Sequence, residues 1–263
     1  MYAFEYKKVS SIAEATQHLN SDTRLLAGGQ TLLAAMKLRL SSPSELIDLQ
    51  NIPNLAGIKK EGSNYIIGAM TRHAEVASHA ELQKDIPGLS YLASHIGDKQ
   101  VRRMGTIGGS IANNDPSACY PSAVLALNAT IITDQREIIA DDYFQGVFTT
   151  ALNANEIIKA IRFPIPQNSA YAKFVQPASR YAMVGVYVAK HNSGVRVAIT
   201  GSINGVYRHS GLEAALNKEY SSEAVKAIAI DADDFSSDLH ATATYKAAIV
   251  IVQTKQAVID SMA

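Results

Sequence analysis

The hydrophobic residues of the first fifty positions follow two alternating periodicities. Segments with apolar residues three or four positions apart, as on one face of a helix, alternate with short apolar runs typical of strands. Ser41-Ser42-Pro43 closes the second helical segment, because proline cannot continue a helix. The pattern predicts a small β-α-β unit. Its elements are a helix over 11–20, a strand over 23–27, a helix over 31–40 and a strand over 45–49.

The next hundred residues mix helical and strand patterns. Thr71 is expected to cap a helix that starts at 71–75, since threonine is a preferred N-cap residue. Pro164-Ile165-Pro166 interrupts the pattern and gives the clearest internal boundary. Between these points we predict a strand over 64–70, helices over 89–96 and 121–127, a hairpin of 130–133 with 136–140, and a strand over 157–163.

Beyond residue 169 the pattern changes to strand runs in series, followed by helical segments. The runs at 170–176, 182–190 and 195–202 predict an antiparallel meander, and 211–216, 223–230 and 243–259 are predicted to be helical. The chain is therefore predicted to be α+β. We expect an N-terminal domain over 1–165, with subdomains of about 1–55 and 56–165, and a C-terminal domain over 166–263.

Composition narrows the class of protein. With 24 basic and 24 acidic residues among 263, the chain lacks the basic excess expected of a nucleic-acid-binding protein. The single cysteine, Cys119, excludes an intrachain disulfide and an iron–sulfur cluster held by several cysteines of this chain. The apolar run 247–252 is too short to span a bilayer, and the first ten residues lack the apolar core of a signal peptide. We therefore expect a cytoplasmic protein.

Two glycine pairs are the candidate chemistry. Gly28-Gly29 follows a predicted strand, and Gly108-Gly109 lies between apolar segments. Glycine has no Cβ, so backbone amides there can approach a ligand closely, and successive amides can bind an anion. Two such loops could hold the diphosphate of a dinucleotide. An isolated Gly-Gly is usually only a turn. Because no G-x-G-x-x-G occurs in the chain, a Rossmann NAD site is disfavoured.

Other polar residues give weaker signals. The polar loop 113–117, between apolar elements, needs hydrogen-bond partners that a flavin ribityl chain and diphosphate would supply. The Asp141-Asp142 pair has no apparent catalytic partner and is expected to form a turn. We predict no metal site and no catalytic side chain. Three histidines lack metal-ligand spacing and are expected at the surface or at helix caps: His73, His79 and His95.

Four segments together carry a resemblance to a known family. They are Ala27-Gly28-Gly29-Gln30-Thr31-Leu32-Leu33 with Met36-Lys37-Leu38-Arg39-Leu40, then Gln100 to Ser110, then Asp115-Pro116-Ser117-Ala118, and Pro177 to Val186. In order and spacing the chain resembles the FAD-binding medium subunit of the molybdenum hydroxylases, of the carbon monoxide dehydrogenase and xanthine dehydrogenase type. The match covers nearly the whole chain.

The resemblance implies a fold and a set of FAD-binding residues. The fold would be the FAD-binding fold of the vanillyl-alcohol oxidase type, with two α/β subdomains, followed by a C-terminal domain with a three-stranded antiparallel sheet and helices. The diphosphate loops would be Ala27, Gly28, Gly29, Gln30 and Thr31, flanked by Leu25, Leu26 and Leu32, and Thr106, Ile107, Gly108, Gly109 and Ser110. Further cofactor contacts would come from Asn114, Asp115, Cys119, Ile158 at the isoalloxazine ring, and Lys173 with Tyr181 from the C-terminal domain.

Cys119 departs from the family pattern, because relatives often carry an aspartate there that helps to bind FAD. A thiol accepts hydrogen bonds less well than a carboxylate. The cofactor contact is then either lost or made by Asn114 or Asp115. Alternatively, Cys119 is simply a small buried hydrophobic residue.

The resemblance also implies a function. The chain would carry FAD in a heterotrimeric molybdenum hydroxylase, take electrons from a 2Fe-2S small subunit and pass them to an external acceptor. A molybdopterin-binding large subunit would oxidise the substrate, and the complex would be a dimer of heterotrimers. Two alternatives remain open: a stand-alone flavin oxidoreductase, and a flavin-free scaffold subunit of such a complex.

Overall fold

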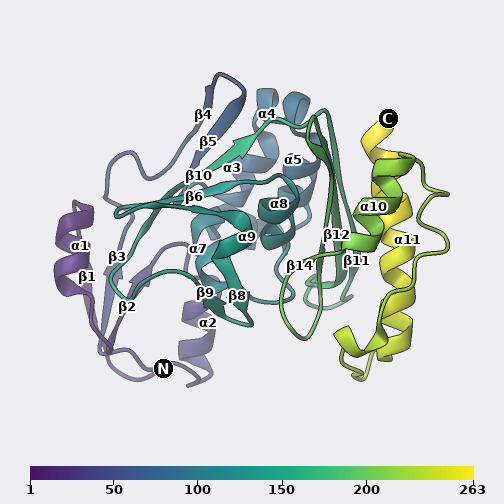
Figure 1. Cartoon of the computed structure of the whole chain (residues 1–263). Coiled ribbons are helices and arrows are strands. Elements are labelled where there is room, and N and C mark those ends of the chain that lie inside the picture. Colours follow the sequence, from purple (N-terminus) through teal and green to yellow (C-terminus); the bar gives the residue numbers. More distant parts are fainter.

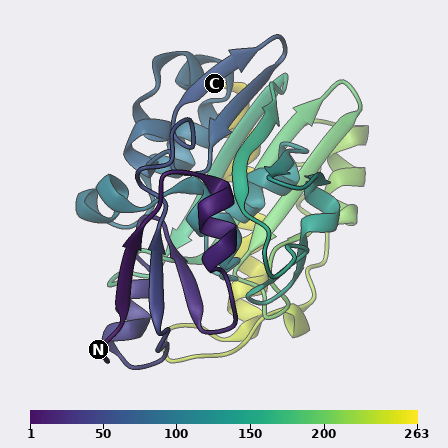
Figure 2. The same ribbon diagram turned by 90° about the vertical axis from the view of Figure 1, so that its left-hand side faces the viewer.

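The computed structural model describes residues 1–263 and contains three main sheets with helices packed around them (Figure 1). The N-terminal sheet is parallel, with strand order β1-β3-β2 (Figure 2). Strand β2, helix α2 and strand β3 form the predicted β-α-β unit, which is confirmed. The bounds are β1 Glu5–Lys8, α1 Ile12–His18, β2 Thr23–Leu26, α2 Leu32–Lys37 and β3 Glu45–Asp48.

The second sheet is antiparallel and has five strands in the order β4-β5-β10-β6-β7. The predicted hairpin is confirmed as β6 and β7. Its bounds and those of the neighbouring elements are β4 Ile58–Glu61, β5 Asn64–Gly68, α3 His73–Ser78, α4 Ala80–Asp85, α5 Pro87–Ser94, α6 Lys99–Met104, α7 Ile107–Asn113, α8 Tyr120–Ala126, β6 Thr130–Thr133, β7 Glu137–Ile139, α9 Ala140–Tyr143, β8 Phe144–Gly146, β9 Thr149–Thr150 and β10 Ile158–Pro164.

The C-terminal sheet is an antiparallel meander, as predicted, but it has four strands instead of three because the two-residue strand β14 adds to its edge. Helices α10 and α11 cover one face, and α5 and α8 cover the other (Figure 1). The bounds are β11 Asn168–Val175, β12 Ala182–His191, β13 Gly194–Thr200, β14 Tyr207–Arg208, α10 Ser210–Lys218, a 3-10 turn Ala232–Asp234 and α11 Ala243–Met262.

Strand β12, one of the two inner strands of this sheet, is buried on both faces. Val186 and Val188 belong to the core under α10 and α11, while Tyr187 and Ala189 belong to the core that includes α5 and α8. Alternate residues of a strand point to opposite faces, so one strand serves both cores. The C-terminal sheet therefore shares a core with the preceding half of the chain, and the domain boundary near residue 165 stays a prediction.

Two local predictions were wrong. Residues 223–227 form turns and 228–230 are irregular: Val225 is the one fully buried residue, Ala224, Ile228 and Ile230 pack half-buried on the core, and a helix this short is marginal without strong packing. Thr71 does not cap a helix: its hydroxyl donates to the carbonyl of Gly57 at 3.0 Å and accepts from the N–H of Gly57 at 2.9 Å. Helix α3 accordingly starts two residues later, with Arg72 at the N-cap. None of the helices combines the length and apolarity that crossing a bilayer requires.

Candidate cofactor site

The two glycine loops, far apart in sequence, lie against each other. A Cβ on Gly28 would stand only 2.2 Å from the carbonyl oxygen of Met104, just before the second loop. A Cβ on Gly109 would lie 3.6 Å from the Cβ of Ala27. Glycine at position 28 thus permits a backbone approach that no other residue allows. This contact places both predicted diphosphate loops at one site.

The first loop offers a row of free backbone donors. The N–H groups of residues 27–32 have no acceptor within the protein. Gly29 has φ +70°, a left-handed conformation that favours glycine. The amide of Gln30 folds back and donates to the carbonyl of Gly28 at 3.1 Å. Consecutive free amides in such a turn form a concave site suited to phosphate oxygens.

The second loop is built differently. The N–H of Gly108 donates to the carbonyl of Ala69 at 2.8 Å, and the N–H of Gly109 donates to the hydroxyl of Thr106 at 3.2 Å. A Cβ on Gly108 would stand 2.5 Å from the Cβ of Ala69. The glycines here allow close packing against strand β5, and their amides are already used. What this loop presents outward is the half-buried surface of Gly109 and Ser110.

The same segment after β5 connects the second loop to Ile158. The N–H of Ala69 donates to the carbonyl of Lys159 at 2.9 Å, and its carbonyl accepts from Gly108. The pairing of β10 with β6 shifts register between Ile158 and Ala160. Such bulges redirect the backbone and are frequent beside active sites. Ile158, predicted to meet the isoalloxazine ring, therefore lies at a backbone irregularity near the glycine loops.

The polar loop is fixed by its own side chains. Asn114 adopts a left-handed conformation with φ +44°, and its amide nitrogen donates to the carbonyls of Gly146 at 2.7 Å and Thr149 at 2.8 Å. Its Oδ1 atom is buried and has no partner. Asp115 is half-buried and accepts from the N–H of Ser117 at 2.8 Å. Asn114 thus ties the loop to the β8–β9 hairpin, and its contact with a cofactor stays a prediction.

Lys173 joins the C-terminal sheet to the end of α5 and the start of α8. Its ammonium donates to the carbonyls of His95 at 2.6 Å and Arg180 at 2.9 Å, and lies 3.6 Å from the sulfur of Cys119. Cys119 is buried at the start of α8. The predicted approach of Lys173 toward the first half of the chain is therefore present, with a thiol and two carbonyls as its partners.

A cavity of about 490 Å³ opens beside these groups. Tyr181 lines it and is 44% exposed, and both burial and the nearby Asp115 carboxylate raise the pKa of its phenol. Gln176 and His240 also line the cavity, and no motif identified them: Gln176 ends the predicted strand run 170–176, and His240 lies in an irregular segment. The lining residues are Asp115, Ser117, Gln176, Pro177, Ala178, Ser179, Tyr181 and His240.

The predicted cofactor residues divide into an accessible and a buried group. The accessible group can contact a ligand directly, whereas the buried group shapes the backbone behind it. Residues that are exposed or half-buried are Leu25, Leu26, Ala27, Gly28, Gly29, Gln30, Thr31, Leu32, Gly109, Ser110, Asp115 and Lys173. Buried residues are Thr106, Ile107, Gly108, Asn114, Cys119 and Ile158.

His73 lies beneath the second loop and is buried, contrary to the expected surface or cap position. A Cβ on Gly105 would stand 2.6 Å from its Nε2 atom, and its Nδ1 atom has no partner. The ring packs on Tyr120 with centroids 5.3 Å apart. Burial, assisted by the charge of Arg102, lowers the pKa of His73 to about 4. His79 does cap a helix, accepting from the N–H of Leu82 at 3.2 Å.

Acid is expected to destabilise the protein through His73. Its folded pKa of about 4 lies below the unfolded value of 6.5, so the unfolded chain takes up a proton first. Stability should fall by about 2 kcal/mol between pH 7 and pH 5 from this group alone. Urea unfolding of the native chain and of His73→Gln at both pH values measures it. Equal losses in the two proteins would contradict the assignment.

Comparison with known proteins gives a consistent picture. The family described as "FAD binding domain in molybdopterin dehydrogenase" matches residues 2–166. The carbon monoxide dehydrogenase medium chain of Hydrogenophaga pseudoflava is 37% identical, covering 97% of this chain and 95% of that one. The nicotine 6-hydroxylase medium subunit of Paenarthrobacter nicotinovorans is 31% identical, with 98% and 97% covered.

Solved structures agree with these matches. A chain of the carbon monoxide dehydrogenase from Hydrogenophaga pseudoflava, in a form that lacks the Mo-pyranopterin moiety of its molybdenum cofactor, superimposes with a TM-score of 0.90 at 36% identity. The superposition covers 99% of this chain and 98% of that chain. The expected fold class is confirmed, and the relatives' names mark them as medium chains or subunits of larger enzymes.

Proposed function

Because this chain belongs to the family of FAD-binding domains in molybdopterin dehydrogenases, we propose that it is the FAD-carrying electron-transfer subunit of a heterotrimeric molybdenum hydroxylase. It would take electrons from a 2Fe-2S small subunit and pass them to an external acceptor. A molybdopterin-binding large subunit would oxidise the substrate, and the complex would assemble as a dimer of heterotrimers. The chain is thus an oxidoreductase subunit whose substrate chemistry takes place elsewhere.

The observation that carries the proposal is the free amide row of residues 27–32 beside the glycine contact at Met104. A dinucleotide diphosphate brings negative oxygens that such donors can satisfy. Gly109 and Ser110 would close the site from the opposite loop. The donors and the space that the glycines leave therefore fit the diphosphate of FAD.

The protein's task at this site is to bind and orient the cofactor. When bound, FAD supplies the capacity to accept a pair of electrons and release them. Lys173 would place a positive charge at the site, since its partners are two carbonyls and a thiol and none is a carboxylate. Tyr181 would cover the cofactor from the C-terminal half, next to Asp115. No side chain is required to move a proton to a substrate.

The visible absorption spectrum of the purified chain, before and after adding FAD, tests the proposal. Flavin bands that survive desalting are expected, either in the isolated chain or in the native complex. Copurification with two further subunits should distinguish the proposed complex from a stand-alone flavin oxidoreductase. A native complex that stays colourless at flavin wavelengths and cannot be reconstituted would overturn the proposal and favour a flavin-free scaffold.

A further inference from the structure

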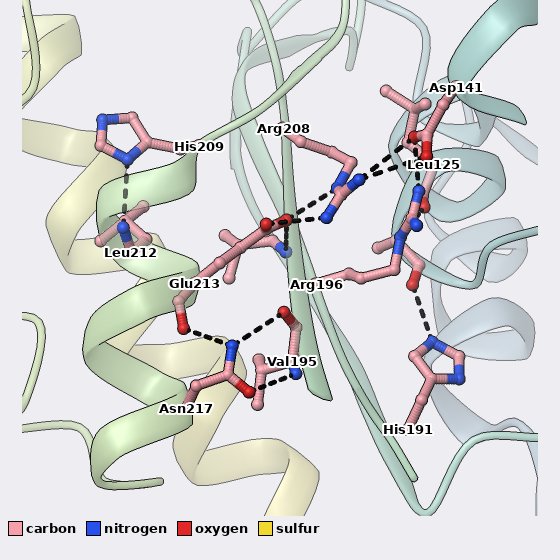
Figure 3. Close-up of polar contacts among 12 residues, drawn as sticks. Leu125, Asp141, His191, Val195, Arg196, Arg208, His209, Leu212, Glu213 and Asn217 are labelled. Atoms are coloured by element: carbon pink, nitrogen blue, oxygen red, sulfur yellow. Dashed lines mark hydrogen bonds and ion pairs between the residues drawn. The ribbon is translucent and has the colours of Figure 1, made fainter. Parts of the chain in front are cut away.

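Two side chains of the C-terminal sheet hold the carboxyl end of helix α8 (Figure 3). Arg196 donates from Nε to the carbonyl of Leu125 at 2.8 Å, and His191 donates from Nε2 to the carbonyl of Ala126 at 2.9 Å. The last carbonyls of a helix lack partners within the helix. A cation at this end also interacts favourably with the helix dipole. The C-terminal half thus supplies a donor for the carbonyl of Ala126 and a second donor for that of Leu125, which also accepts from the N–H of Asn128 at 3.2 Å.

Asp141 completes this arrangement from the other half of the chain. Its carboxylate, on the short helix α9, accepts from Arg196 and, at 3.2 Å, from Arg208. Arg208 in turn forms a two-pronged pair with Glu213, with both contacts at 2.8 Å. Asp141 was expected to lie in a turn; it lies instead in the one-turn helix α9 and forms ion pairs with two arginines. We call Asp141, His191, Arg196, Arg208 and Glu213 the clasp (Figure 3).

The clasp is balanced in charge and partly shielded from water. Two guanidinium groups face two carboxylates, and burial lowers the pKa of His191, which favours its neutral form. The side chain of Arg196 is only 13% exposed. Loss of the Asp141 carboxylate would leave Arg196 in a poorly solvated position without its charged partner, which costs more than loss of an exposed pair.

Helix α8 connects the clasp to the candidate cofactor site. Its seven residues are all buried, and it packs on β12 and β13. Cys119, at its other end, lies against the ammonium of Lys173. Seven residues span about 10 Å at 1.5 Å per residue. A rigid buried helix of this length transmits a shift at one end to the other.

We propose that the clasp positions the flavin. Asp141 and Arg196 fix helix α8, and α8 in turn holds Cys119 against the ammonium of Lys173, where the two halves of the chain are in contact. The inference rests on the proposed function. None of the clasp residues lines the cavity, so they act through α8. The cofactor site is divided between the halves, with Asp115 and the glycine loops on one side and Lys173 and Tyr181 on the other. The geometry of the cofactor site therefore depends on the contacts that fix the two halves relative to each other.

The substitution Asp141→Asn tests the proposal in the full chain, or in the native complex if only the complex retains FAD. It removes one charge with little change in size. We expect the Kd for FAD to rise about tenfold, the visible flavin spectrum to shift, and amide exchange over 119–126 to quicken. The double variant Asp141→Asn with Arg196→Gln should lose less affinity than the two single variants added together, because neither charge is then left alone.

Glu137→Gln is the matched control. Glu137 of strand β7 pairs with Arg162 of strand β10, both in the second sheet, so this pair makes no contact with the C-terminal half. The Glu137→Gln variant should leave the Kd for FAD, the visible flavin spectrum and the amide exchange over 119–126 unchanged. If Asp141→Asn does not fold, Arg208→Gln removes only the outer part of the clasp and should give a smaller change in the same direction.

The outcomes separate the two proposals. Unchanged FAD affinity and spectrum in Asp141→Asn, with the native chain binding FAD normally, would overturn the positioning role alone. Equal effects of Glu137→Gln and Asp141→Asn would overturn it as well, by showing a general response to charge loss. Failure of the native chain and the native complex to bind FAD would overturn the proposed function itself.

Discussion

Replacement of Gly28 by alanine is expected to abolish retention of FAD through desalting. A methyl group at this position would stand 2.2 Å from the carbonyl oxygen of Met104 and 2.7 Å from the Cα of Gly105. Both neighbours are backbone atoms, so the first loop must move away from the second. The free amides of residues 27–32 would then no longer face the same ligand as Gly109 and Ser110. We expect the Kd for FAD to rise at least about 100-fold, or roughly 2.7 kcal/mol.

Two other glycines provide controls for this experiment. Gly62, with φ +60°, has open space around its Cβ position in the β4–β5 turn, so Gly62→Ala should cost about 1 kcal/mol of stability and leave FAD binding intact. Gly109→Ala is the positive control: its methyl group would lie 3.0 Å from the Thr106 hydroxyl and 3.6 Å from the Cβ of Ala27, so the chain should fold but fail to retain FAD. Measurement of the flavin absorbance after desalting, with thermal unfolding alongside, gives the result. A flavin-replete Gly28→Ala protein would contradict the assignment of the first loop.

Local patterns in the sequence were sufficient for most of the fold. The β-α-β unit of the first fifty residues and the C-terminal meander follow from periodicity, because each element buries one face or both. The segment 223–230 shows where this reasoning stops. Its helical spacing is real, but Val225 is its one fully buried residue, and Ala224, Ile228 and Ile230 reach the core half-buried from turns and irregular backbone. Tertiary packing, which no local pattern contains, decides whether a short helix forms.

The site was less predictable than the fold. The glycine pairs were visible in the sequence, but the same dipeptide has a different structural role in each loop. The N–H of Gly28 has no acceptor within the protein, whereas the N–H of Gly108 donates to the carbonyl of Ala69. That difference depends on which strand passes behind each loop. Likewise, the partners of Asp141 lie 55 and 67 residues away, at Arg196 and Arg208. Contacts of that range arise only from the assembled sheets.

One strong interaction that no motif indicated holds the start of strand β10. Glu156 has a fully buried side chain, and Arg136 donates to both of its carboxylate oxygens at 3.0 Å. The hydroxyl of Thr133 donates at 2.7 Å and the N–H of Asn153 at 2.9 Å. Burial alone would raise the pKa of Glu156, but these donors lower it to about 2. The cluster joins the β6–β7 turn to the strand that carries Ile158.

Glu156→Gln is expected to lower the free energy of unfolding by about 2 kcal/mol at pH 7, between the values for an exposed and a fully buried pair, because Glu156 is buried while the side chain of Arg136 is 45% exposed. An amide cannot accept from Arg136 through both atoms, so one donor is left unsatisfied. The folded pKa of Glu156 is depressed, so its stabilisation is complete above the unfolded value of 4.5 and is lost as the pH falls toward 2.

Urea unfolding of native and Glu156→Gln protein from pH 7 down to pH 3 therefore measures both the size and the sign of the effect. The gap between the two curves should be widest near neutrality and should narrow below pH 4.5, because Glu156 then takes up a proton in the unfolded chain while the folded carboxylate stays ionised until the pH approaches 2. Glu137→Gln removes the partly exposed pair with Arg162 and should cost less than about 1 kcal/mol. If the two variants were equally stable, burial would not be what gives the Glu156 cluster its strength, and the placement of Ile158 would depend on the strand pairing of β10 alone.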